Sequence, residues 1–111
     1  MKLQLVGKMA GEPEFNHPAF REAAKQLREH GHEVFSPAEI DGGDTSRPTA
    51  YYMRQCIGAL LRAEGVVLLP NWEASQNART ELRVALALGL AVFSLDSNIP
   101  AWALGREGPD D

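Results

Sequence analysis

The chain has 111 residues and a formal net charge of −4, and it is 44% hydrophobic and 23% charged. This length predicts one soluble domain with a modest core, so we expect a homodimer or a higher homo-oligomer. The acidic balance argues against a nucleic-acid polymer as partner, because such proteins usually carry a basic face, but it leaves a nucleoside or nucleotide ligand open.

Cysteine content and hydropathy exclude further classes of protein. Cys56 is the single cysteine, which excludes a disulfide framework and a CxxC metal pair. No apolar run approaches the roughly 20 residues that a membrane-spanning helix needs, and the start of the chain is too short in apolar residues for a signal peptide. We therefore expect a cytoplasmic protein with no membrane partner, no metal and no cofactor.

The first part of the chain predicts a β-α-β unit. Residues 3–6 form an apolar strand, and a loop with two glycines and a proline follows over residues 7–13. Apolar residues then recur at helical spacing between Pro18 and His30, and residues 33–36 give a second short strand. Such a unit is right-handed with parallel strands. Its loop has neither the GxGxxG nor the GxxxxGK[ST] spacing of the standard phosphate loops.

The middle of the chain predicts a polar loop and a second helix. Residues 38–48 are rich in glycine and acids without the spacing of a calcium loop, so we expect a mobile solvent loop rather than a metal site. Residues 49–63 then predict an amphipathic helix. Its apolar stripe consists of Met53, Cys56, Ile57, Leu60 and Leu61.

Two strands and a helix complete the predicted elements. Residues 65–69 are a continuous apolar run, typical of a strand covered on both faces. Ser75 or Asn77 caps a third helix that Gly89 closes, and residues 90–94 form a fourth strand. The apolar stripe of the third helix consists of Ala78, Leu82, Ala85 and Leu86.

This alternation of strands and helices predicts a flavodoxin-like or Rossmann-like α/β fold, in which a doubly wound parallel sheet carries helices on both faces. The expected strand order is 2-1-3-4, with a fifth strand as an option. We expect residues 1–96 to form a single domain and residues 97–111 to be a tail that contacts another subunit and then frays. The strand order changes direction between strands 1 and 3, so a ligand is expected between the loops 7–11 and 70–77.

Glu81 is the leading catalytic candidate. It lies near the predicted start of the third helix, beside the expected ligand crevice. The positive end of a helix lowers the pKa of a carboxyl group and favours its ionised form, which suits attack at an anomeric carbon or stabilisation of an oxocarbenium-like centre. The alternative is a surface glutamate that pairs with Arg79 or Arg83.

Other side chains near the crevice each allow two interpretations. Ser75 and Asn77 either donate to a phosphate group or cap the helix, and the two roles are compatible. Trp72 either stacks on a base or covers the sheet edge. His17 lies near the first loop and can reach the crevice. Cys56 is more typical of a buried structural thiol than of a nucleophile.

Several motifs occur in the order and spacing of a known family. They are residues 7–11, 16–20 and 27–39 in the front half, and residues 52–54, 68–75, 78–81 and 87–92 in the back half. With these motifs the chain resembles the nucleoside 2-deoxyribosyltransferase-like superfamily, and most closely its small DUF4406 branch, which is common in phages and bacteria. The resemblance covers about residues 3–94.

The resemblance implies a homo-oligomer that acts on the N-glycosidic bond of a deoxynucleoside or its 5′-monophosphate, as an N-hydrolase or a deoxyribosyltransferase. In the family the glutamate of an S-x-x-A-x-x-E motif is the nucleophile, which matches Glu81. The upstream serine that helps to hold the ligand matches Ser75. The loop after the first strand wraps around the sugar or phosphate in relatives, and here it presents Gly7, Lys8, Met9 and Gly11.

The chain also departs from the family pattern. Relatives place an aspartate that assists the leaving base where this chain has Cys56, and a neutral thiol does not act as an ionised aspartate. Three further departures replace a tyrosine, a serine and an aspartate by Gln4, Val6 and Glu64. Two functions therefore stay open: an enzyme with Cys56, Tyr52 and His17 as auxiliary groups, or a non-catalytic protein that binds or sequesters a nucleotide. An oligomeric scaffold without a ligand is the third interpretation.

Overall fold

The computed structural model describes residues 1–95, which contain one four-stranded sheet. Its strands are β1 (Lys2–Val6), β2 (Glu33–Phe35), β3 (Gly65–Leu68) and β4 (Ala91–Ser94). All neighbouring strands pair in parallel, in the order β2-β1-β3-β4. The predicted fold class and strand order are therefore confirmed. The optional fifth strand and the tail expected over residues 97–111 lie outside the described residues.

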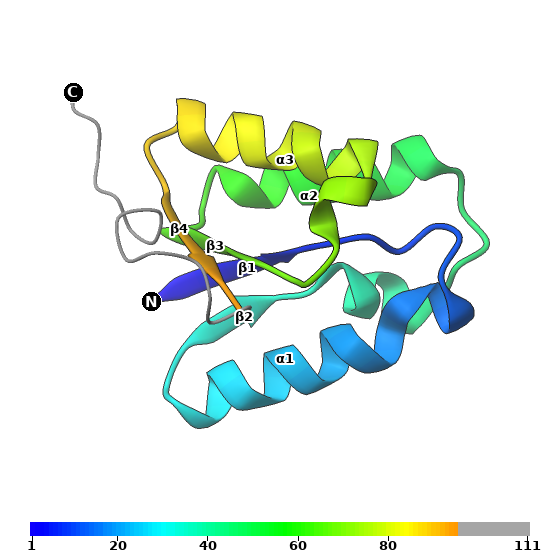
Figure 1. The fold of residues 1–111 in the computed structure, drawn as a ribbon, viewed down its shortest axis with the longest axis horizontal. Coiled ribbons are helices and arrows are strands. Elements are labelled where there is room, and N and C mark those ends of the chain that lie inside the picture. Colours follow the sequence, from blue (N-terminus) through cyan, green and yellow to red (C-terminus); the bar gives the residue numbers. More distant parts are fainter. Residues whose placement is uncertain (96–111) are drawn as a thin grey trace.

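Within residues 1–95, three α-helices cover both faces of this sheet (Figure 1). α1 (His17–Glu29) lies on one face, and α2 (Thr49–Leu60) and α3 (Gln76–Ala87) lie together on the other. Because both faces are covered, a central strand can be apolar throughout, and all four residues of β3 are buried. Among residues 1–95, no helix is both long enough and apolar enough to cross a membrane.

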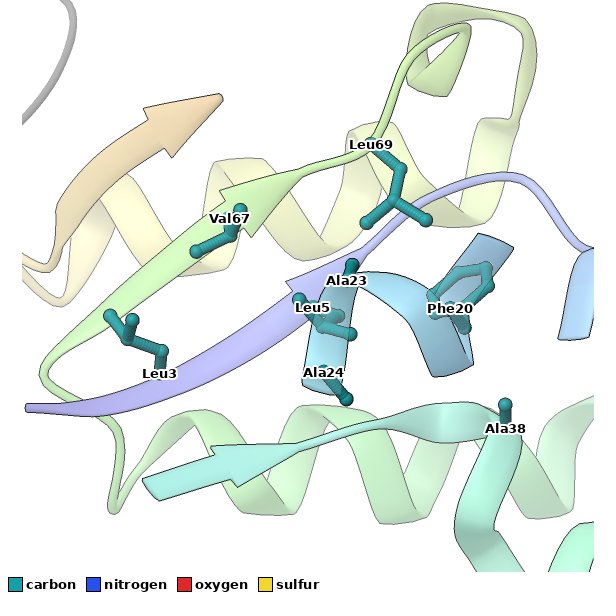
Figure 2. Close-up of a cluster of buried hydrophobic side chains, with 8 residues drawn as sticks. All are labelled: Leu3, Leu5, Phe20, Ala23, Ala24, Ala38, Val67 and Leu69. Carbon is teal, nitrogen blue, oxygen red and sulfur yellow. The ribbon is translucent and has the colours of Figure 1, made fainter. Parts of the chain in front are cut away.

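Alternate side chains of β1 enter two separate cores. Leu5 belongs to the first core, where it packs with Phe20 and Ala23 of α1 (Figure 2). Val6 points to the opposite face and joins the second core with Leu60 of α2 and Ala85 of α3. This alternation fixes β1 between the two helical layers, so the loop that follows β1 emerges at the boundary between them.

The helices begin and end close to their predicted limits. α1 begins one residue before Pro18, whereas α2 ends at Leu60 rather than at Ala63 because residues 61–62 form a turn. Ser75 is the N-cap of α3, and its hydroxyl oxygen accepts a hydrogen bond from the backbone N–H of Ala78 at 3.0 Å. Of the two predicted caps, the serine is therefore the one that the structure uses.

Two leucines of the predicted apolar stripes are exposed, and these assignments were wrong. Leu61 is 72% exposed because it lies beyond the last residue of α2, and Leu86 is 54% exposed. The buried positions of α3 are Ala78, Glu81 and Ala85, so a glutamate takes a place on the inward face and Leu86 turns outward. A stripe drawn from hydrophobicity alone assigns Glu81 to the surface and therefore misplaces this face.

The predicted solvent loop between β2 and α2 is more structured than expected. A 3-10 helix, η2, spans Pro37–Gly43, and both this helix and the residue after it are tied to the first turn of α2. The Tyr51 hydroxyl donates to the Asp41 carboxylate at 2.6 Å, and the Tyr52 hydroxyl donates to the backbone oxygen of Asp44 at 2.5 Å. Two aromatic side chains of α2 thus give this segment a defined path between β2 and α2.

Gly7 follows β1 at a point where the backbone passes close to the first core. A Cβ at this position would lie 3.0 Å from Leu69 Cβ and 3.1 Å from the ring of Phe20. We expect Gly7→Ala to lower the free energy of unfolding by about 1–3 kcal/mol, because the packed neighbours must shift. Urea denaturation followed by circular dichroism measures this change.

Gly58, inside α2, is the matched control for Gly7. A Cβ at Gly58 would meet no atom within 4 Å, so Gly58→Ala is expected to raise the free energy of unfolding by about 0.5–1 kcal/mol through helix propensity. Equal effects of the two substitutions would contradict the close approach at Gly7.

Candidate functional site

A cavity opens beside the carboxyl ends of the strands. Its volume is about 170 Å³, and residues that follow β1, β2 and β3 all contribute to its walls. This is the region where the change in strand order predicts a ligand. The lining consists of Gly7, Met9, Ala10, Phe15 and His17 near the start of α1, Pro37, Asp44, Thr45 and Arg47 between β2 and α2, Thr49, Tyr52, Met53 and Cys56 in α2, and Ser75, Asn77 and Glu81 at α3.

Glu81 reaches this cavity from the inward face of α3. The residue is only 7% exposed, and within residues 1–95 its carboxyl group has no hydrogen bond and no ion pair. The structure therefore contradicts the alternative in which Glu81 lies on the surface and pairs with Arg79 or Arg83. Arg79 donates instead to the backbone oxygen of Glu73. An unpartnered carboxyl group at the wall of a cavity is free to interact with a ligand.

Burial raises the pKa of Glu81 from an ordinary value of 4.5 to about 8. This reverses the expectation that the helix N-terminus lowers the pKa and keeps the group ionised. Glu81 is the sixth residue of α3, and the effect of the helix dipole falls off within the first turn. Loss of hydration therefore dominates, and the carboxyl group is mostly protonated at neutral pH.

Cys56 contributes a neutral thiol to the same cavity. Burial first, and the neighbouring Glu81 second, raise the pKa of the Cys56 thiol well above its usual range. A thiol in this state is not a nucleophile. The backbone oxygen of Cys56 accepts a hydrogen bond from the buried side chain of Gln4 at 2.8 Å. The Gln4 side chain thus ties α2 to β1.

The start of α3 brings two predicted ligand-binding residues to the cavity. Ser75 is half-buried and its hydroxyl caps the helix, while Asn77 is exposed at the second helical position. Capping leaves further acceptor and donor capacity on the Ser75 hydroxyl, because a hydroxyl group has one proton and two lone pairs. Ser75, Asn77 and Glu81 line the same side of the cavity at the start of α3. A polar group of a ligand that binds at the start of the helix would therefore lie near the carboxyl group of Glu81.

Two auxiliary candidates, His17 and Tyr52, also line the cavity. His17 is buried at the first position of α1, and burial, followed by the positive charge of Arg21, lowers the pKa of its imidazole. The imidazole is therefore neutral at physiological pH. The Tyr52 hydroxyl both donates to Asp44 and accepts from the backbone N–H of Arg47, so it holds the β2–α2 segment against the cavity.

Three residues that were expected to bind the ligand do not line this cavity. The Lys8 amine donates to the backbone oxygen of Ala10 at 2.7 Å and lies 3.4 Å from the Glu12 carboxylate, which turns it back onto its own loop. Gly11, with a φ of +84°, supplies the turn beside that amine. Trp72 packs against the second hydrophobic core, which supports the interpretation that it covers the sheet rather than a base.

Sequence reasoning missed several lining residues, among which Phe15 and Arg47 are the most informative. Phe15 lies in the 3-10 helix η1 (Pro13–Asn16) and adopts a left-handed backbone with φ of +54°, and it is 44% exposed. Arg47 lies two residues before α2. An aromatic or basic residue just before a helix is the signal that could have marked them. No group of three or more histidine, cysteine or acidic side chains within residues 1–95 is placed to hold a metal ion.

Comparisons with known proteins agree with the fold. The model of the family described as domain of unknown function (DUF4406) matches residues 1–94. No curated protein matches the chain in sequence. A solved structure of a 2-deoxyribosyltransferase from the psychrotolerant bacterium Bacillus psychrosaccharolyticus superposes with a TM-score of 0.67 at 21% identity, over 90% of this chain and 77% of that one. The resemblance drawn from the motifs is thereby confirmed at the level of family and fold.

Burial of Glu81 predicts a pH-dependent stability. Because the pKa is about 8 in the folded state and near 4.5 when unfolded, the folded protein binds the extra proton between these values. Stability from this group is complete below about pH 4.5 and is lost as the pH rises through 8. Between pH 5 and pH 9 we expect the free energy of unfolding of wild type to fall by roughly 2–5 kcal/mol relative to that of Glu81→Gln.

Urea unfolding of both proteins at pH 5, 7 and 9 measures this difference. The neutral amide of Glu81→Gln does not titrate, so the difference between the two curves isolates the carboxyl group from His17 and other titrating residues. Parallel stability curves for the two proteins would show that the carboxyl group is not buried as described.

Proposed function

We propose that this chain, which belongs to the DUF4406 family and has the fold of a 2-deoxyribosyltransferase, acts on the N-glycosidic bond of a (deoxy)nucleoside or its 5′-monophosphate. The reaction is hydrolysis or transfer of the sugar to a second base, with Glu81 as the nucleophile. The homo-oligomeric state and the cytoplasmic location expected from the sequence belong to the same proposal.

The observation that carries this proposal is the unpartnered carboxyl group of Glu81 in the cavity. It closes the Ser75-x-x-Ala78-x-x-Glu81 motif, in which the serine caps the helix and Ala78 is fully buried. A carboxyl group kept out of water without a hydrogen bond costs stability, so its position calls for a functional explanation. A carboxylate directly stabilises a reacting carbon that becomes positively charged, so glycosidic chemistry provides such an explanation.

The proposed chemistry needs the ionised form of Glu81. With a pKa of about 8, roughly one carboxyl group in ten is ionised at pH 7. A carboxylate oxygen attacks C1′ and forms a bond to it, and the C1′–N bond breaks as the base leaves with the electron pair and takes up a proton. Water, or a second base, then attacks C1′ and releases the carboxylate. Positive charge at C1′ stabilises the ionised carboxylate, because Glu81 is buried and has little hydration of its own.

The remaining lining residues would hold the substrate around this carbon. Hydrogen-bonding groups line the cavity on two sides: the backbone at Gly7 and Met9 after β1, and the side chains of Ser75 and Asn77 at the start of α3. Phe15 offers an exposed aromatic ring at the cavity, where Trp72 was expected to serve, and it can stack on a base.

A second candidate function is non-catalytic nucleotide binding on the same scaffold. The observation that favours it is Cys56, which replaces the aspartate that assists the leaving base in relatives and which is held as a neutral thiol. For a binding protein, the nucleotide raises the melting temperature of the protein and is recovered unchanged. An enzyme releases free base, so chromatography of the incubated ligand separates the two functions.

Substitution of Glu81 tests the proposed nucleophile. We expect Glu81→Ala and Glu81→Gln to lower the rate of base release from deoxynucleosides or their 5′-monophosphates by roughly 1,000-fold or more, because no other lining carboxyl group is buried. Glu73→Gln, at an exposed carboxylate outside the cavity, is the matched control and should keep the wild-type rate. Turnover retained in Glu81→Gln would sink the mechanism.

The pH dependence of the rate follows from the same group. Since the carboxylate is the reactive form, kcat/KM is expected to rise about tenfold per pH unit below the pKa of Glu81, and to level off above about 8. Rates measured in overlapping buffers from pH 5.5 to 9.5 provide the test. A rate that is flat from pH 5.5 upward would mean that Glu81 is already ionised there, and the assigned role of burial would be wrong.

A further inference from the structure

The charges of the cavity lining are unevenly distributed. At neutral pH Glu81 is mostly protonated, and burial lowers the pKa of His17 so that its ring is neutral. Two lining residues are ionised. Hydrogen bonds from Ser46 lower the pKa of Asp44, which is a carboxylate, and Arg47 carries the positive charge. A negatively charged group on a ligand therefore has Arg47 as its cationic partner among the lining residues that the structure describes.

The two ionised side chains differ in what they already bind. The Asp44 carboxylate accepts a hydrogen bond from the backbone N–H of Ser46 at 2.9 Å and so completes a turn of its own segment. Arg47 approaches Asp41 only through Nε, at a distance of 3.9 Å from the carboxylate oxygen. Within residues 1–95 its two terminal amino groups have no hydrogen-bond partner. The fork that matches a phosphate group is thus free.

Arg47 is also held in place. Its guanidinium group lies 4.7 Å from the centroid of the Tyr51 ring, and the Tyr51 hydroxyl donates to the same Asp41 oxygen that faces Arg47 Nε. The Tyr51 ring in turn packs edge-on against Tyr52, with the centroids 5.4 Å apart, and the Tyr52 hydroxyl accepts from the backbone N–H of Arg47. Orientation of a side chain before binding lowers the entropy that the complex must lose.

The surroundings of Arg47 suit an anion. Thr45 and Thr49, two residues to either side of it, both line the cavity and carry hydroxyl donors. Thr49 is the first residue of α2, whose N-cap Pro48 makes no side-chain capping bond. The backbone N–H of Tyr51 already donates to the backbone oxygen of Pro48 at 3.0 Å, so the N–H groups of Thr49 and Ala50 are the further donors of this turn. These groups add to the guanidinium at one end of the cavity.

We propose that Arg47 binds the phosphate group of the substrate and thereby selects a deoxynucleoside 5′-monophosphate over the free deoxynucleoside. This inference rests on the proposed function, since it names the substrate class of the same cavity. Tyr51 and Asp41 are positioning residues, which act through the guanidinium group. Loss of a charged hydrogen-bonding partner weakens binding by about 10- to 100-fold.

Binding measurements on the full 111-residue chain test this selection without turnover. In the Glu81→Gln background, isothermal titration with the four common deoxynucleosides and their 5′-monophosphates should give at least tenfold tighter binding for one monophosphate than for its nucleoside. Adding Arg47→Gln should remove this preference and leave the affinity for the nucleoside unchanged. Arg54→Gln, at an exposed arginine of α2 outside the lining, is the matched control and should keep the preference.

The outcomes separate this inference from the proposed function. Equal affinity for nucleoside and monophosphate, a preference that survives Arg47→Gln, or no binding of either ligand class would each overturn the role of Arg47. Unchanged nucleoside affinity in Arg47→Gln shows that the cavity is still folded. If wild type binds the monophosphate through Arg47 but never releases a base, the glycosidic proposal fails and the assignment of Arg47 stands.

Discussion

The site depends on a carboxyl group that the fold keeps out of water. Glu81 takes a place on the inward face of α3 that hydrophobic patterning would give to a leucine, between Ala78 and Ala85. These two small residues are fully buried, so α3 packs closely on the sheet and the longer glutamate side chain reaches the cavity between α3 and its neighbours. The raised pKa of Glu81 and the lack of a competing ion pair follow from this placement, whereas the thiol of Cys56 is neutral chiefly because Cys56 is itself buried.

The rest of the molecule determines what surrounds that group. The Gln4 side chain ties α2 to the central strand through Cys56, and Gly7 lets the loop after β1 pass closely over Leu69 and Phe20. The segment before α2 is held by Tyr51 and Tyr52 of that helix and brings Arg47 to the cavity. The buried, neutral Glu81 and Cys56 form one wall of the cavity, and Arg47 and Asp44 are its ionised lining residues. Because the Asp44 carboxylate binds within its own turn, the cavity suits a ligand with an anionic end and a carbon that becomes cationic.

The sequence predicted those helices and strands whose limits are set by residues close to one another along the chain. Helical spacing after Pro18, the continuous apolar run of β3 and the capping serine before α3 are sequence features with direct structural causes, and each was recovered within a few residues. The expected strand order was also confirmed, and the continuous apolar run of β3 lies inside the sheet, where both faces are covered. Glu81 was found as a candidate because its motif survives intact, although its charge state was misjudged.

The remaining features depend on contacts between segments distant in sequence. The sign of the Glu81 pKa shift is set by packing of α3 against the sheet, which no local rule reports. Phe15 and Arg47 lie in segments without periodicity, whose paths are fixed by left-handed backbone turns and by tyrosines of α2. The sequence left open whether Trp72 contacts a ligand or covers the sheet, and its packing against the second core depends on residues distant in sequence.

The most direct test of this account is a carbon-13 NMR titration of the glutamate side-chain carboxyl groups, with the Glu81→Gln spectrum used to assign the Glu81 signal. The account predicts that this signal titrates near pH 8, well separated from those of the exposed glutamates. A midpoint near the ordinary value of 4.5 would mean that the carboxyl group is hydrated and ionised in the resting protein, and would contradict the buried, protonated Glu81 from which the site is built.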